Sequence, residues 1–199
     1  MKGEIVFDIE TQNTFADVGN DMKKFKVSVV SIYEYDTDKY TSFTENNISA
    51  LWPFLEKATR LIGYNSEHFD LPILNNYYPG DLLQFSHLDL IKEVQKSLGR
   101  RLKLDDIAKA TLDDIKKTAD GLQAIRWWKE GKIAEIKKYC EQDVRVTKEI
   151  YDFGRQHKQL FYSSFSGDML PFAVNFEEVD DKKKNSAGNG ANINLTLPI

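Results

Sequence analysis

The chain lacks an excess of positive charge. Its 199 residues include 27 lysines and arginines against 31 aspartates and glutamates, which gives a formal net charge of -4. Proteins whose main task is to hold nucleic acid are usually basic, because neutralising phosphates supplies most of their affinity. The composition therefore disfavours that class. Any contact with nucleic acid is expected to be brief and local, or helped by bound cations.

Cysteine and long apolar runs are also scarce. Cys140 is the only cysteine, so no internal disulfide can form, and a reducing compartment is expected. The apolar run of residues 5–7 ends at Asp8, too soon for a signal peptide, and no stretch has the length of a membrane span. The three histidines lack the spacing of metal ligands. We therefore expect a cytoplasmic protein without membrane contact.

The remaining composition is that of one folded domain with a tail. Hydrophobic residues make up 41% of the chain, which is enough for a core. We expect one domain over residues 1–176. From residue 177 to residue 199 the composition becomes charged and then rich in Asn and Gly, which predicts a flexible polar tail.

Strand patterns alternate with helical patterns along the predicted domain. Stretches rich in β-branched and aromatic residues predict strands within 4–11, 24–36, 38–46, 60–65 and 85–91, and a hairpin within 159–176. Apolar spacing predicts helices at about 90–98, 104–112, 121–130 and 132–156, and shorter ones within 48–58 and 69–80. This order predicts an α/β fold, a mixed five-stranded sheet flanked by helices with a C-terminal β-hairpin.

Three residues suggest where the two shorter helices begin and end. Ser49 is a candidate cap for the helix within 48–58, and Pro53 must then lie in the first turn, where a helix tolerates proline. The pair Pro79-Gly80 is expected to stop the helix within 69–80.

The first predicted strand carries two acids on one face. In the stretch IVFDIET, Asp8 and Glu10 are two residues apart, and side chains two apart on a strand point the same way. Two carboxylates side by side at the end of an apolar strand repel each other unless cations balance them. The pattern therefore indicates a site rather than a simple buried strand.

The longest predicted helix places another acid at the edge of its buried side. Tyr139 and Asp143 are four residues apart and share a helix face. That face borders the apolar stripe, whose members recur at steps of three and four: Ile133, Ile136, Cys140, Val144, Thr147 and Tyr151. A carboxylate in that position requires a partner or a metal.

A fourth acid, Asp70, follows a predicted strand and opens a predicted helix. Active sites of open α/β sheets gather at the ends of strands, so Asp70 is expected near Asp8 and Glu10. Mg²⁺ and Mn²⁺ prefer oxygen ligands, and two such ions about 3.5–4 Å apart commonly break phosphodiesters. The acids therefore predict a site for two divalent cations.

Three motifs carry a resemblance to a known family. They are D-x-E in FDIET, N-x3-F-D in NSEHFD and Y-x3-D in YCEQD, and they occur in this order. Together they resemble the DEDD 3′–5′ exonucleases with a ribonuclease H-like fold, and within these the tyrosine subclass, DEDDy. The chain is similar to stand-alone proteins related to the proofreading exonuclease domain of family B DNA polymerases. The resemblance, which includes LDDIAKATL, covers roughly residues 4–176.

The resemblance implies a role for each matched acid. Asp8 would bridge two divalent ions, Mg²⁺ or Mn²⁺. Glu10 and Asp143 would complete the ion on the nucleophile side, and Asp70 would hold the other ion, directly or through water. The histidine subclass places a histidine five residues before the last aspartate, where this chain has Lys138, so the tyrosine subclass is favoured.

The same resemblance implies roles for four uncharged residues. Tyr139 would orient the attacking water. Asn65 and Phe69 would shape the site or touch the terminal nucleotide, and Thr11 would contact it through its backbone or hydroxyl. The implied activity is hydrolysis of single-stranded nucleic acid from its 3′ end, with DNA favoured over RNA and nucleoside 5′-monophosphates as products.

Three other functions remain open. An RNA-trimming 3′–5′ exoribonuclease would have the same fold and the same acids. A non-catalytic scaffold that binds nucleic acid or protein would usually have lost a metal ligand, whereas this chain keeps all four. A nuclease that cuts internally would lack the Y-x3-D motif on its helix.

Each signal also has an ordinary structural explanation. Asp8 and Glu10 would mark a solvated strand end, Asp70 would be a helix N-cap, and Tyr139 with Asp143 would be a flanking pair on an amphipathic helix. Cys140 is expected to be a buried small apolar residue. Taken jointly, the order and context of the motifs favour the metal site over these explanations.

The aromatic and basic residues outside the motifs support weaker hypotheses. Trp127 and Trp128 more often anchor a helix than stack on bases. Several cations are either surface charges or phosphate contacts, namely Arg100, Arg101, Lys103 and the pair Lys116-Lys117.

Overall fold

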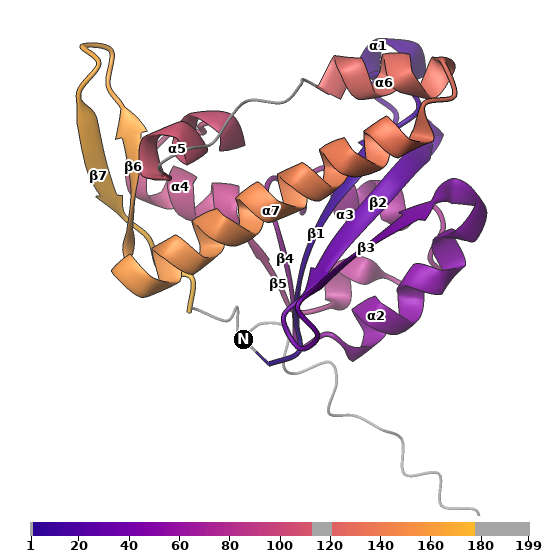
Figure 1. Ribbon diagram of the computed structural model, residues 1–199, viewed down its shortest axis with the longest axis horizontal. Coiled ribbons are helices and arrows are strands. Elements are labelled where there is room, and N and C mark those ends of the chain that lie inside the picture. Colours follow the sequence, from indigo (N-terminus) through magenta and orange to yellow (C-terminus); the bar gives the residue numbers. More distant parts are fainter. Residues whose placement is uncertain (1, 113–120, 178–199) are drawn as a thin grey trace, which may run out of the picture.

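Five strands form one mixed sheet in the order β3-β2-β1-β4-β5 (Figure 1). The computed structural model describes residues 2–112 and 121–177. The strands are β1 (Glu4–Thr11), β2 (Val27–Glu34), β3 (Lys39–Thr44), β4 (Arg60–Gly63) and β5 (His87–Asp89). β1 pairs antiparallel with β2 and parallel with β4, and its register places Val6 opposite both Tyr33 and Ile62. The central strand therefore carries the first predicted acids.

Helices cover the sheet and a separate hairpin follows the last of them. The helices are α1 (Phe15–Val18), α2 (Trp52–Lys57), α3 (Asp70–Leu74), α4 (Leu90–Leu98), α5 (Leu104–Thr111), α6 (Gly121–Lys129) and α7 (Ile133–His157). Short 3₁₀ helices span Met22–Lys24, Glu45–Leu51 and Leu82–Gln84. The hairpin is formed by β6 (Gln159–Ser163) and β7 (Met169–Ala173). The predicted fold class is confirmed.

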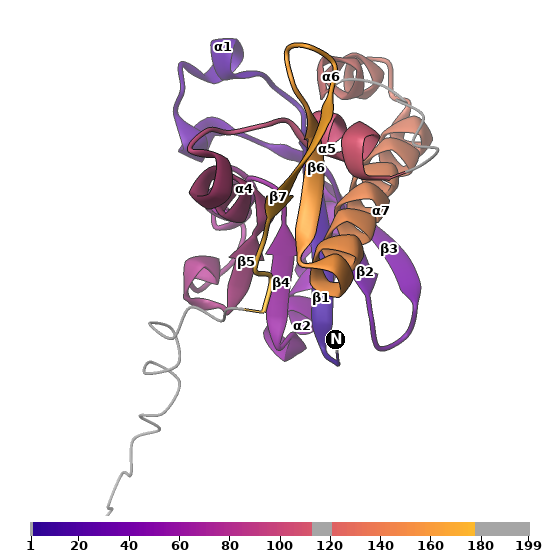
Figure 2. The same cartoon turned by 90° about the vertical axis from the view of Figure 1, so that its left-hand side faces the viewer.

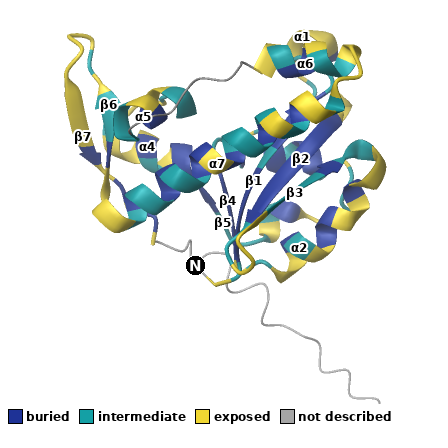
Figure 3. Ribbon diagram, viewed as in Figure 1, coloured by how far each residue is buried: buried dark blue, intermediate teal, exposed yellow. Residues whose placement is uncertain are grey.

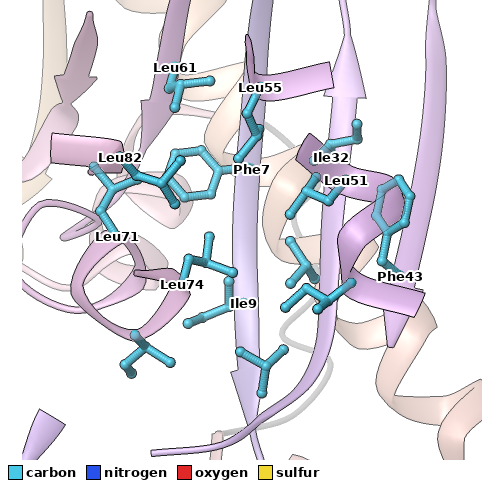
Figure 4. Close-up of a cluster of buried hydrophobic side chains, with 14 of the residues drawn as sticks. Phe7, Ile9, Ile32, Phe43, Leu51, Leu55, Leu61, Leu71, Leu74 and Leu82 are labelled. Atoms are coloured by element: carbon cyan, nitrogen blue, oxygen red, sulfur yellow. The ribbon is translucent and has the colours of Figure 1, made fainter. Parts of the chain in front are cut away.

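The alternation of β1 divides the core between the two faces of the sheet. Phe7 and Ile9 point to the face covered by α2 and α3, where Figure 4 shows them among leucines of these elements. Full burial of such a side chain contributes about 1.5–3 kcal/mol. Val6 points to the opposite face, beneath α7 and beside α4 and α5. Asp8 and Glu10 lie on the same face of β1 as Val6. Figure 3 shows that α7, which covers this face, has both buried and exposed residues along its length.

Two of the predicted helix signals are wrong. Ser49 caps no helix: it lies inside the 3₁₀ helix Glu45–Leu51, whose N-cap residue Thr44 donates from its backbone N–H and its hydroxyl to the Asn47 side-chain oxygen. Pro53 does lie in the first turn of α2, as predicted. α3 ends at Leu74, before Pro79-Gly80, because the Asn75 side chain accepts a hydrogen bond from the Leu82 backbone N–H at 2.8 Å and turns the chain back.

Two predictions concern residues outside the described ranges. The pair Lys116-Lys117 lies in the gap between α5 and α6, and the predicted tail falls almost entirely on residues 178–199. Within residues 2–112 and 121–177, none of the helices has both the length and the hydropathy that crossing a membrane requires. The cytoplasmic location stays a prediction.

A buried polar network fixes α7 at the end of the sheet far from the acids. Arg60 at the start of β4 pairs with Glu4 at 2.6 Å and donates to the Phe176 carbonyl oxygen at 2.9 Å. The Tyr151 hydroxyl of α7 donates to the same Glu4 carboxylate at 2.9 Å. These charges are buried and paired, which is the condition under which burial is tolerated. The network thus sets the position of α7 along β1, and with it the position of Asp143.

Alanine at Gly154 should lower the free energy of unfolding by about 1–3 kcal/mol through overpacking. The fully buried ring of Phe176 crosses α7 at this glycine, and an added Cβ would lie 2.2 Å from the Phe176 Cε2 atom. Urea denaturation measures the change. Gly121→Ala is the matched control, because a Cβ there meets nothing within 4 Å. Equal stability of both variants would show that the Phe176 ring moves aside freely.

Candidate active site

Three acids meet where β1 passes beneath α7. Asp8 and Glu10 come from the strand and Asp143 comes from the helix, and one carboxylate oxygen of each lies within 4.8 Å of the others. Glu10 is buried, and Asp8 and Asp143 are partly buried. The alternative that Asp8 and Glu10 mark a solvated strand end is therefore wrong.

Asp70 joins this cluster from the other side of β1. Strand β4 pairs with β1 only as far as Val6, which leaves the Ile9 backbone N–H without a strand partner on that side. This N–H donates to the Asp70 carboxylate at 3.2 Å. Asp70 is the first residue of α3 and Phe69 is its N-cap, so the alternative explanation of Asp70 as an ordinary N-cap is wrong.

Burial raises the pKa of all four carboxylates, and the other acids of the cluster add to the shift at Asp8 and Glu10. Burial, followed by the charges of neighbouring acids, raises the pKa of Asp8 and of Glu10 well above the ordinary values. Burial, with Asp89 nearby, raises the pKa of Asp70 to about 8. Burial also raises the pKa of Asp143 to about 6, although a hydrogen bond from Tyr139 opposes the shift.

These acids fit divalent cations better than protein cations. No ion pair within residues 2–112 and 121–177 involves any of the four carboxylates. Ionised carboxylates at this spacing repel each other, and bound cations would remove the repulsion. All the candidate metal-ligand atoms are carboxylate oxygens, which Mg²⁺ and Mn²⁺ prefer. Divalent metals are the cofactors of ribonuclease H-like nucleases, and the arrangement could hold them.

Tyr139 keeps its proton beside this cluster. Its hydroxyl donates a hydrogen bond to Asp143, one helical turn along α7. Burial and the charges of Asp143, Glu10 and Asp8 raise the pKa of Tyr139 far above its ordinary value. The Trp127 ring packs edge-on against the Tyr139 ring at 6.2 Å between centroids. Tyr139 can therefore donate a hydrogen bond near the acids, but cannot serve as a base.

A cavity of about 470 Å³ opens beside the acids. Six of the eight predicted site residues line it: Asp8, Glu10, Thr11, Asn65, Phe69 and Asp70. The other two, Tyr139 and Asp143, lie on α7 and join the site through the carboxylate cluster. The structure thus gathers all eight residues, while their chemical roles stay predictions. The Thr11 hydroxyl donates to the Asn13 carbonyl oxygen at 2.9 Å.

Asp89 positions the loop that carries Asn65, and the sequence analysis missed it. Its carboxylate accepts hydrogen bonds from the backbone N–H groups of Asn65 at 2.6 Å and Glu67 at 3.0 Å. Asn65 has a positive φ of 63°, an uncommon conformation that these bonds help to hold. An acid at the junction of β5 and α4 was the available signal, and it is similar to the one that identified Asp70, an acid between a predicted strand and a predicted helix.

An aromatic group in the wall of the cavity was also missed. Phe15 and Phe25 pack with Phe69 at centroid distances of 4.9–5.6 Å, and all three line the cavity. Phe15 lies on α1, which the sequence analysis did not predict. The available signal was a capping box, since Thr14 caps α1 while the Asp17 side chain bonds back to the Thr14 backbone.

Cys140 and the two tryptophans behave mainly as core residues. Cys140 is fully buried, as predicted, and its Sγ lies 3.3 Å from the Asp8 carbonyl oxygen and 3.6 Å from Asp8 Oδ2. Burial raises the pKa of the Cys140 thiol, so it remains protonated. Trp127 and Trp128 are partly buried against the group that includes Cys140 and Ile136. The prediction was that they dock a helix on the sheet, and the group they pack against joins α6 and α7 to Val29 of the sheet strand β2.

One predicted surface cation reaches the site wall. The Arg101 guanidinium donates to the Asn65 side-chain oxygen, while the adjoining Arg100 lies over the Tyr162 ring of the hairpin at 5.3 Å. Lys103 immediately precedes α5 and is exposed. Arg101 is therefore more than a solvated surface charge.

The fold and the carboxylate cluster together define a ribonuclease H-like nuclease fold. A sequence model described as the RNase_H superfamily matches residues 5–153, about three-quarters of the 199 residues. The chain belongs to this superfamily. No curated protein sequence matches it.

A solved structure supports the same fold. The family B DNA polymerase from the hyperthermophilic archaeon Pyrobaculum calidifontis matches with a TM-score of 0.60 and 18% sequence identity. The match covers 76% of this chain and 24% of the polymerase chain, so this chain spans about a quarter of that protein's length. At this identity the likeness shows the fold alone. The predicted membership in the ribonuclease H-like group, with a likeness to family B DNA polymerases, is confirmed.

Proposed function

We propose that the protein is a two-metal-ion 3′–5′ exonuclease that removes nucleoside 5′-monophosphates from the 3′ end of single-stranded nucleic acid, with DNA favoured. One observation carries this proposal: four carboxylates and a protonated tyrosine converge beside a cavity of about 470 Å³. The order of the three sequence motifs along the chain, which resembles that of the DEDDy exonucleases, also supports the proposal.

The carboxylates would divide between two Mg²⁺ or Mn²⁺ ions. Asp8 would serve both ions. This role is supported by the grouping of its carboxylate with those of Glu10 and Asp143, and by the charge of Asp70, which also raises the pKa of Asp8. When bound, the two ions supply an activated water at one position and charge stabilisation of the leaving oxygen at the other. Asp70, held by the Ile9 N–H, would contribute to the second position.

The remaining residues would position the substrate and the attacking water. Tyr139 keeps its proton and would donate a hydrogen bond to the water. Phe69 and Phe15 offer ring faces to the terminal base, and stacking of this kind accepts any base. Asn65 would contact the sugar or phosphate of the same nucleotide, since Arg101 and Asp89 fix its orientation. The scaffold alternative is disfavoured, because all four acids are present and gathered.

A gel time course with oligonucleotides labelled at the 5′ end tests the proposal. With Mg²⁺ or Mn²⁺, DNA carrying a single-stranded 3′ end should give a ladder that shortens from the 3′ side, and EDTA should stop it. An RNA strand of the same sequence reports the preferred sugar. A circular single strand should remain intact, because an exonuclease requires an end. Cleavage of the circle, or no cleavage of any strand by folded protein with metal, would contradict the proposal.

A further inference from the structure

The exposed large hydrophobic residues of the described chain gather in two places. Phe15 and Leu122 line the site cavity, and their exposed fractions are 45% and 56%. Phe165, Met169 and Leu170 lie on the β6–β7 hairpin, and Phe165 is fully exposed. Figure 3 shows the hairpin tip and much of β7 as exposed. An exposed apolar cluster on one projecting element is typical of a binding surface.

The tip that presents Phe165 is ordered by its own hydrogen bonds. The Ser164 backbone N–H donates to the Asp168 carbonyl oxygen at 2.8 Å, and the Ser166 hydroxyl donates to the Asp168 carboxylate at 2.6 Å. Gly167 supplies the positive φ of 88° that the turn needs. The phenylalanine is thus held outward by a defined turn.

A second cavity of about 470 Å³ lies between this hairpin and α5. Arg100 and Lys109 line it together with Tyr162 and Met169, and Asp106 is the acid among the lining residues. The Arg100 guanidinium lies 5.3 Å from the Tyr162 ring centroid and 6.0 Å from that of Phe165. Cations beside exposed aromatic rings are the chemistry that binds single-stranded nucleic acid, through phosphate contacts and base stacking.

The two cavities share a wall. The adjoining residues Arg100 and Arg101 contact the hairpin and Asn65 respectively, and consecutive Cα atoms are about 3.8 Å apart. The Tyr64 hydroxyl, from the site cavity, donates to the carbonyl oxygen of Leu102, from the hairpin cavity, at 2.8 Å. Figures 1 and 2 both place the hairpin tip at the same end of the molecule as α1 and α6.

We infer that the hairpin cavity binds the nucleotides upstream of the 3′ end of a single strand whose terminal nucleotide occupies the site cavity. Phe165 and Tyr162 stack on bases, and Arg100 and Lys109 contact phosphates. This inference rests on the proposed exonuclease function. A nucleic acid fits better than an apolar protein partner, because two of the three charged lining residues are cations in a chain of net charge -4.

Binding of a fluorescein-labelled dT12 strand with Mg²⁺, in an Asp143→Asn background, tests the surface directly. Phe165→Ala should weaken binding at least about fivefold, the lower range for loss of one stacked base. Arg100→Ala should weaken it too, and should lower the slope of log affinity against log salt by about 0.7. Phe165→Tyr should bind as the unchanged protein does, because it keeps a ring face.

Arg145→Ala is the matched control. Arg145 of α7 lies 5.5 Å from the ring centroid of Tyr40, the same pairing as Arg100 with Tyr162. Tyr40 belongs to β3, at the opposite edge of the sheet from β5. The Arg145→Ala variant should bind dT12 with unchanged affinity and with an unchanged slope of log affinity against log salt. In the otherwise native protein, Phe165→Ala and Arg100→Ala should lower kcat/KM on dT12 and leave kcat/KM on a dinucleotide unchanged. Equal losses on both substrates would mean a structural effect and would overturn the inference.

The remaining outcomes separate this inference from the proposed function. If the native protein degrades dT12 and all hairpin variants bind dT12 equally, the hairpin inference is wrong and the exonuclease stands. If the native protein hydrolyses nothing while the variants still lose dT12 affinity, the exonuclease is wrong and the binding surface stands. Self-association that Phe165→Ala abolishes, with unchanged dT12 binding, would assign the hairpin to a protein interface and overturn the inference.

Discussion

Replacing Asp8 with asparagine should abolish hydrolysis while raising the melting temperature of the metal-free protein. The pKa of Asp8 is raised by the charges of all three other acids, so its removal is expected to affect both proposed ion positions. Metal ions contribute several kcal/mol to phosphoryl transfer, and each 1.4 kcal/mol is a factor of ten, so activity should fall at least about a thousandfold. The stability gain follows because asparagine has no acid to bury: burial and the neighbouring acids raise the pKa of Asp8 in the folded protein, which costs stability at any pH above the unfolded pKa. Oligonucleotide cleavage and thermal melting in EDTA at pH 8 measure the two effects.

Glu141→Gln is the matched control for this experiment. Glu141 lies on α7 two residues before Asp143, but its carboxylate accepts a hydrogen bond from the Ser42 hydroxyl at 2.6 Å, away from the cluster. Glu141→Gln should therefore leave the cleavage rate unchanged. The combination of lost activity with raised stability is diagnostic, because a variant that merely misfolds loses both. Activity of Asp8→Asn within about tenfold of the unchanged protein, a difference of 1.4 kcal/mol, would contradict the metal site.

The acids could be located from the sequence because each is marked by local periodicity. Asp8 and Glu10 interrupt an apolar strand at alternate positions, and a strand of that pattern places them on one face. Tyr139 and Asp143 are four apart on a helix whose buried stripe fixes which face they occupy. The boundaries of α7 and the hairpin followed from the same signals. Local pattern therefore determined both the elements and the direction of these side chains.

The parts that escaped prediction depend on contacts between distant segments. Asp89 acts on Asn65, which is 24 residues away, and Arg101 reaches the same side chain across 36 residues. Neither contact produces a periodic pattern in the sequence. Ser49 was a locally reasonable cap, yet a 3₁₀ helix begins earlier, after the hydrogen bonds that Thr44 donates to the Asn47 side chain, and Ser49 lies inside it. Ser49 and Thr44 are both possible helix caps, and the sequence alone does not show which of them begins the helix.

In the absence of divalent metal, the protein should lose stability as the pH rises from about 5 to 8. The pKa of Asp143 is raised to about 6 and that of Asp70 to about 8, whereas an unfolded aspartate titrates near 3.9. Between these values the folded state holds protons that the unfolded state has released. Raised pKa values of this kind contribute stability below the unfolded pKa, and the contribution disappears as the pH passes the folded value.

Divalent metal should reverse this trend, because it binds the ionised carboxylates of the folded protein. Saturation at about 100 times the dissociation constant contributes about 2.7 kcal/mol, which is about 5–10 °C in melting temperature for a chain of this size. The difference between melting curves in Mg²⁺ and in EDTA should therefore widen from pH 5 to pH 8. Sodium chloride of equal ionic strength controls for screening, and Asp8→Asn should flatten both the pH trend and the metal effect. A metal-free protein that becomes more stable across this range would show that protein cations already neutralise the acids, which would remove the physical reason for placing ions there.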